Sequence, residues 1–115
     1  FIDEGRALLE RLAPGARLLA YGHLGDGNLH LNLSPAAGAD GQTLRAAGDA
    51  IGRAVHNLVA SHGGSISAEH GIGQLKVGEL ARYEDPAALE LMRKIKQAID
   101  PQGIMNPGKV LDDRA

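Results

Sequence analysis

The sequence predicts an α+β fold in which helices pack on one face of an antiparallel sheet, with a helical tail at the C-terminus. The first observation is a hairpin signal, Asp26-Gly27, between two runs of alternating apolar and polar residues. The second is apolar residues at helical spacing over 1–13 and 42–61, on either side of that hairpin. The third is the composition, because 43% hydrophobic residues with only 3% aromatics leave the core to aliphatic side chains.

The first element is a helix over 1–13, which Pro14-Gly15 ends. Its helical face carries Ile2, Gly5, Leu8, Leu9 and Leu12.

The hairpin follows over about 16–33. A two-residue type I′ loop at Asp26-Gly27 pairs His23 directly with His30. The same loop pairs Gly25 with Asn28 and Leu24 with Leu29. One face is then apolar: Leu18, Ala20, Gly22, Leu24, Leu29, Leu31 and Leu33. The other face carries Tyr21, His23, Asn28, His30 and Asn32.

A loop over 34–41 leads to the second helix, 42–61, which Asp40 caps and Gly63-Gly64 stops. We expect a short third strand over 65–68, and then a glycine-rich turn into a short helix that ends near Tyr83.

The last helix begins with Asp85 as its N-cap and Pro86 at its first position, and it ends before Pro101. Two tight turns over 100–109 follow it. Three strands make a small sheet, so we expect at least one open edge.

Composition excludes several classes of function. A net charge of −2 with no basic patch gives no electrostatic case for nucleic acid. Cysteine is absent, so a metal must use histidine, carboxylate or amide ligands, and a reducing compartment is compatible. We expect a cytoplasmic location, or one peripheral to a membrane through other subunits.

His23 and His30 form the strongest candidate site. Directly opposed residues have Cβ atoms roughly 4.5–5.5 Å apart, which lets both rings reach one cation. Protonated imidazoles in this position would repel each other unless a cation or an acid is shared. Glu69 is the natural third ligand, and two histidines with one carboxylate leave open coordination positions. Zn²⁺ is the first expectation, with Mn²⁺, Fe²⁺ or Co²⁺ as alternatives; the competing interpretation is two surface histidines on a solvated strand.

Glu69 and His70 are adjacent, so on an extended strand they point to opposite sides. His70 would need the following glycine turn to reach the same pocket, and it is either a catalytic base or a strand-end histidine bonded to backbone. We interpret His56 and His62 as structural or solvated.

Three motifs together resemble the C-terminal end of FAD-linked oxidases of the glycolate oxidase, D-lactate dehydrogenase and D-2-hydroxyglutarate dehydrogenase group. They are Gly22-His23-Leu24-Gly25-Asp26-Gly27-Asn28-Leu29-His30, Glu69-His70-Gly71-Ile72-Gly73, and Asp100-Pro101 through Asn106-Pro107-Gly108-Lys109-Val110-Leu111. The resemblance implies that His23, His30 and Glu69 bind a divalent metal and that His70 is the catalytic base. It also implies that Asn32 contacts substrate and that Asn106 lies near the flavin.

The resemblance implies a ferredoxin-like cap, with 1–115 as a single partial domain, the C-terminal part of the substrate-binding domain. The FAD-binding domain would lie upstream in the same polypeptide and is absent from this chain. The expected function is a share in the oxidation of a D-2-hydroxy acid to the 2-oxo acid, with the isolated chain inactive and prone to self-association.

Two alternatives remain open at this point. One is a non-catalytic metal-binding or assembly module. The other is an ether-lipid synthase of the same flavin superfamily, against which the Asp26-Gly27-Asn28 hairpin argues, since that branch resembles a different histidine pattern.

Overall fold

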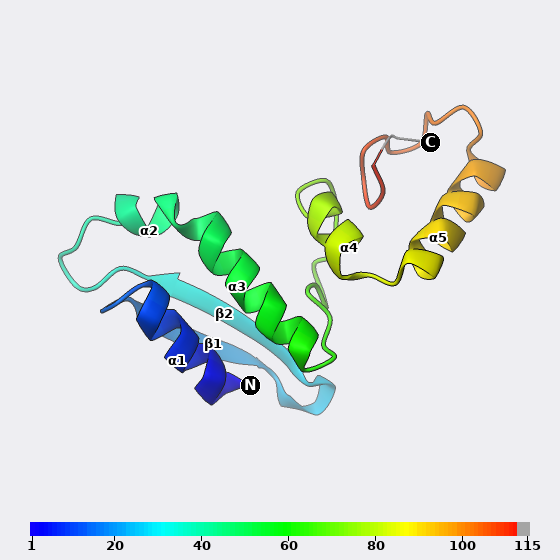
Figure 1. Cartoon of the computed structure of the whole chain (residues 1–115). Coiled ribbons are helices and arrows are strands. Elements are labelled where there is room, and N and C mark those ends of the chain that lie inside the picture. The colour runs from blue at the N-terminus through cyan, green and yellow to red at the C-terminus, as the bar shows by residue number, and fades with distance from the viewer. Residues whose placement is uncertain (113–115) are drawn as a thin grey trace. The chain divides into compact units, whose positions relative to one another are not determined.

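The computed structural model describes residues 1–112, and the chain divides into two compact units, Phe1–Ser65 and the residues from Ile66 onward (Figure 1). The first unit holds three α-helices and a two-stranded antiparallel sheet, and the second, over residues 66–112, holds two α-helices and an irregular tail. The predicted α+β class is confirmed. The third strand is not: among residues 1–112 the sheet has only β1 and β2.

The hairpin consists of β1 (Arg17–His23), a 3₁₀ turn η1 (Leu24–Asp26) and β2 (Asn28–Ser34). The predicted two-residue loop is wrong, because the loop spans four residues and closes with Gly27 in the left-handed conformation, φ +64°. Gly27 donates its backbone N–H to the carbonyl of Leu24, at 3.2 Å. A glycine adopts this φ without steric cost. The predicted partner of Leu29 is wrong too, since Leu24 lies in the loop and is 96% exposed.

The observed register differs from the predicted one by two positions. Tyr21 lies across from His30, and His23 lies across from Asn28. Because side chains alternate with a period of two, this shift leaves every strand residue on its predicted face. We call the side that carries Tyr21, His23, His30 and Asn32 the polar face.

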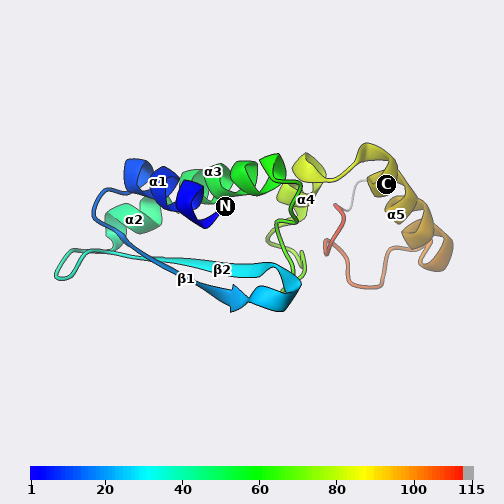
Figure 2. The same ribbon diagram turned by 90° about the horizontal axis from the view of Figure 1, so that it is seen from below.

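The helices α1 (Ile2–Leu12) and α3 (Gly48–Ser61) lie side by side on one side of the hairpin (Figures 1 and 2). They approach closely at Gly5, where an added Cβ would lie 3.9 Å from the side chain of Leu58. Leu9 and Ile51 form the buried core of this unit. A cleft of about 410 Å³ borders that core, lined by Leu9, Leu31, Leu33, Leu44, Arg45, Gly48, Ile51, Gly52, Val55 and His56.

The predicted helix over 42–61 is interrupted. The structure has α2 (Gln42–Ala46) and α3, with Ala47 between them at φ −86° and ψ −2°. Gly48 follows Ala47, and glycine is a weak helix former, which favours a break at this point. The predicted N-cap, Asp40, is wrong by one position, because Gly41 is the N-cap of α2 and makes no side-chain cap bond. Asp40 precedes it, and its Oδ1 accepts the backbone N–H of Gln42 at 3.1 Å.

The second unit contains α4 (Val77–Tyr83) and α5 (Pro86–Ile99). Asp85 is the N-cap of α5 as predicted, and its side chain accepts the backbone N–H groups of Ala87 and Ala88. The strand predicted over 65–68 is wrong, because this segment bends. The hydroxyl of Ser67 donates to the carbonyl of Gly71 at 2.6 Å, a local bond that competes with strand pairing.

Asp100 ends α5 and organises the tail, which spans 100–112. Its side chain is buried and accepts the ammonium of Lys96 and the backbone N–H groups of Ile104 and Met105. These contacts, that of Lys96 foremost, hold the pKa of Asp100 below its ordinary value of 3.8. The tail turns through the predicted turn of Asn106-Pro107-Gly108-Lys109.

No helix of residues 1–112 is both long and apolar enough to cross a membrane.

Candidate metal centre

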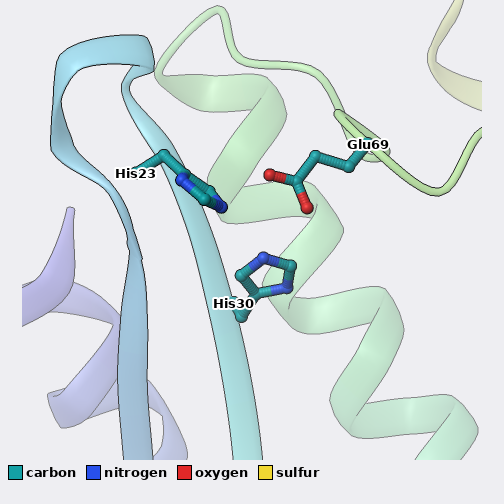
Figure 3. Close-up of side chains that lie close together, drawn as sticks. All are labelled: His23, His30 and Glu69. Atoms are coloured by element: carbon teal, nitrogen blue, oxygen red, sulfur yellow. The ribbon is translucent and has the colours of Figure 1, made fainter.

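Two imidazoles lie together on the polar face of the hairpin. His23 ends β1 and His30 lies within β2, and Figure 3 shows both rings on the same side of the two strands. Their ring centroids are 6.3 Å apart at an interplanar angle of 68°, and each offers a ring nitrogen within 4.8 Å of the other's. The predicted direct opposition is wrong, but the predicted proximity is confirmed.

This geometry fits a shared cation. Zinc–nitrogen bonds are about 2.0–2.1 Å long, so two nitrogens on one ion lie within about 4.2 Å. The observed separation of the two ring nitrogens, within 4.8 Å, is close to that range. His23 is exposed and His30 is half-buried, so further coordination positions stay accessible.

Two more side chains of the polar face, Tyr21 and Asn32, lie near the histidines. The ring of Tyr21 stacks on the His30 ring, with centroids 5.1 Å apart and planes inclined by 19°. The Nδ2 of Asn32 donates to the hydroxyl oxygen of Tyr21 at 3.0 Å. Asn32, expected to contact substrate, thus lies on the same face as the two histidines and is exposed.

Glu69 and His70 belong to the second unit, where they lie in the bend over 68–70. Glu69 is the third side chain that Figure 3 labels. No strand forms over 68–70, so the prediction that Glu69 and His70 point to opposite sides of an extended strand is wrong. The predicted glycine turn is present, with Gly71 at φ +69° and Gly73 at φ +56°.

Asn106 also belongs to the second unit, at φ +48°, in the turn before Pro107. It lines a groove of about 860 Å³ between α5 and the tail. The backbone N–H of Val110 donates to the carbonyl of Gly73 at 2.7 Å. This bond ties the tail to the turn that follows His70, so two of the three predicted motifs meet within one unit.

The remaining histidines have structural surroundings, as predicted. The imidazole of His62 lies 3.1 Å from a carboxylate oxygen of Glu4 and edge-on to the ring of Phe1. That contact lowers the pKa of Glu4 from its ordinary value. His56 is half-buried and lines the cleft beside the core.

Sequence reasoning missed the contacts of Tyr21. Alternation placed Tyr21 on the correct face, but its pairing with His30 depends on the register. The signal that gives the register is the length of the loop, and Asp26-Gly27 is compatible with loops of two and of four residues.

Residues 1–110 match the family model described as FAD linked oxidases, C-terminal domain. The match extends over both units of the chain.

Several curated proteins are similar to this chain. The mitochondrial D-2-hydroxyglutarate dehydrogenase of Arabidopsis thaliana is 46% identical over 101 residues, which are 88% of this chain and 17% of that protein. The corresponding enzyme of Rattus norvegicus is 45% identical over 94% of this chain and 19% of its own length. The D-2-hydroxyglutarate dehydrogenase of Stutzerimonas stutzeri is 38% identical over 96% of this chain and 24% of its own length. The chain thus spans about a fifth of the length of these relatives.

Proposed function

Because this chain belongs to the family of C-terminal domains of FAD-linked oxidases, we propose that it serves a flavin-dependent D-2-hydroxy acid dehydrogenase. Its part is to supply the metal ligands and the catalytic base, while an FAD-binding domain upstream binds most of the flavin. The observation that carries this proposal is the pair of imidazoles on the polar face, with ring nitrogens within 4.8 Å.

In this proposal His23, His30 and Glu69 hold one divalent cation, Zn²⁺ first and Mn²⁺, Fe²⁺ or Co²⁺ otherwise. The chemistry of the donors supports it, since two neutral imidazoles and a carboxylate suit these ions and leave room for a substrate. The exposure of His23 also suits an open site. Asn32 provides an amide on the same face for hydrogen bonds to a substrate oxygen.

His70 is the proposed base. A neutral imidazole suits proton abstraction near neutral pH, and the positive φ of Gly71 lets the backbone turn sharply after it. A bound FAD would supply the acceptor for the hydride of the α-carbon, and a cation held by His23, His30 and Glu69 would supply polarisation of the hydroxyl oxygen. His70 accepts the hydroxyl proton, and Asn106, in the turn tied to the same loop, contributes to the flavin side of the site.

The substrate is a small D-2-hydroxy acid. The relatives above are named D-2-hydroxyglutarate dehydrogenases, which makes D-2-hydroxyglutarate the first candidate. Glycolate and D-lactate are the alternatives from the same group of enzymes. The cytoplasmic location stays a prediction, and two of these relatives are named mitochondrial.

A pair of variants in the FAD-loaded enzyme that carries this chain tests the assignment of roles. His70→Ala should lower turnover by about 10²–10⁴-fold, the usual share of general base catalysis, and should leave the metal content unchanged. His23→Ala should lose metal and turnover together. Loss of metal in His70→Ala, with turnover restored by added metal, would contradict the division of roles.

A further inference from the structure

The polar face contains one residue that contacts two members of the proposed site at once. Tyr21 lies directly across from His30, and its ring stacks on the His30 ring at 5.1 Å with only 19° between the planes. The same side chain reaches diagonally to Asn32, whose Nδ2 donates to its hydroxyl at 3.0 Å. Tyr21 itself is 58% exposed, so burial in a core does not account for its place on this face.

Each contact restrains a different degree of freedom. Near-parallel stacking opposes rotation of the His30 ring about χ2, a torsion that is otherwise broad for histidine. The hydrogen bond to the hydroxyl fixes which end of the Asn32 amide points toward Tyr21, and so directs the carbonyl end away from it. Asn32 is exposed, so without this bond water would leave its amide free to rotate.

We propose that Tyr21 is a positioning residue that orients the metal-ligating ring of His30 through its aromatic face and the substrate-binding amide of Asn32 through its hydroxyl. This inference rests on the proposed function, which gives His30 and Asn32 their roles. It adds a residue that neither ligates the cation nor needs to contact the reacting atoms. Residues that orient a metal ligand typically change metal affinity by about 10–100-fold when they are removed.

Two substitutions of Tyr21 distinguish its stacking on His30 from its hydrogen bond with Asn32. Tyr21→Phe keeps the ring and removes the hydroxyl, so zinc affinity should stay within about twofold. The KM for the hydroxy acid should rise about fivefold, the value of one hydrogen bond, with kcat little changed. Tyr21→Ile removes the ring as well and keeps strand propensity, so zinc affinity should fall about tenfold or more.

Tyr83→Phe is the matched control, because Tyr83 lies on α4 and is the only other tyrosine of the chain. It should leave both the zinc affinity and the KM unchanged. Zinc titration by calorimetry gives the affinity. NMR of the Asn32 side-chain amide and of the His30 ring reports orientation without any catalysis, and Tyr21→Phe should shift the first while leaving the second in place.

A double-mutant cycle covers the case in which Tyr21→Ile fails to fold. If the hydroxyl acts through Asn32, the KM effects of Tyr21→Phe and Asn32→Ala should not add. Additive effects, or an unchanged Asn32 amide signal in Tyr21→Phe, would overturn the inference. If the unmodified chain binds no zinc, the proposed metal site fails instead, and the two NMR signals alone decide whether Tyr21 positions its neighbours.

Discussion

His23 and His30 are diagonal neighbours on one face of the hairpin, displaced by two strand positions. Diagonal pairs lie farther apart than direct ones, about 7–8 Å, but remain within reach of long or aromatic side chains. This spacing leaves His23 across from Asn28 and His30 across from Tyr21. The two rings can therefore converge on a point above the sheet while each keeps a different cross-strand partner.

We predict that this pair supplies most of the affinity of the chain for a divalent cation. His30→Ala should weaken zinc binding by tenfold or more in a calorimetric titration, and His23→Ala should do likewise. His56→Ala is the matched control, because His56 lies on α3 and lines the cleft beside the core. Equal affinities in His30→Ala and His56→Ala would remove the basis of the site.

Gly22→Ala should disturb the end of the hairpin at which His23 lies. A Cβ at Gly22 would come within 2.0 Å of the carbonyl oxygen of Asn28, the cross-strand partner of His23. Overpacking of this kind costs about 1–3 kcal/mol of the free energy of unfolding. Denaturant unfolding followed by circular dichroism measures the loss. Gly25→Ala, where a Cβ meets nothing within 4 Å, should cost far less; equal costs would show that the close approach is relieved by a backbone shift.

Asp100 should make the second unit sensitive to acid. Its contacts with Lys96, Met105 and Ile104 lower its pKa, so the stability it contributes is present above its ordinary value of 3.8 and is lost as pH falls through the lowered pKa. Asp100→Asn, which keeps the shape but loses the charge, should lower Tm by about 5 °C at pH 7. It should also make Tm depend less on pH in the acid range.

Glu90→Gln is the control for Asp100, because Glu90 is an exposed carboxylate of α5 that pairs with Lys94 across one turn. Glu90→Gln should leave Tm close to that of the unmodified chain at each pH between 3 and 7. If the Tm of Asp100→Asn falls with decreasing pH as steeply as that of the unmodified chain, Asp100 is not the source of the acid sensitivity.

Self-association of the isolated chain stays a prediction. In the described residues the sheet has two strands, so each has an outer edge, and open edges favour pairing between copies. The helix α5 adds an exposed apolar stripe at intervals of four residues: Leu91, Ile95 and Ile99, each more than half exposed. Ile95→Lys should reduce association measured by sedimentation at tens of micromolar (roughly 10–100 μM, where weak apolar contacts form).

Gln97→Lys adds the same charge to α5 away from that stripe and should leave the sedimentation profile unchanged. A monomeric profile of the unmodified chain in this range would refute the prediction.

The faces of the hairpin were predictable because alternation is local, and a shift of two positions does not change it. Hence His23 and His30 were expected on one face, and are found there. The length of the loop was not predictable, because Asp26-Gly27 fits two different loops. One is a two-residue turn, and the other is the observed four-residue loop with Gly27 in the left-handed conformation. Capping by Asp85 was predictable for the same local reason.

The prediction of a strand around Ser67 was wrong for a different reason. A short strand was expected over 65–68, but the hydroxyl of Ser67 donates to the carbonyl of Gly71 and accepts from Lys76, nine residues later. Such contacts depend on where the following turn brings the chain. The hydrogen bond of Val110 to Gly73 also joins residues that are distant in sequence, so no local sequence pattern predicts it.

The short separation of the two histidines along the chain has a kinetic consequence. Only seven positions separate His23 from His30, and the strands that carry them are joined by one tight loop. A hairpin of this kind closes in about 1–10 μs, far faster than contacts between distant segments form. The two imidazoles should therefore be in place early in folding, and a cation present at that moment would select molecules in which the strands have already found their native register.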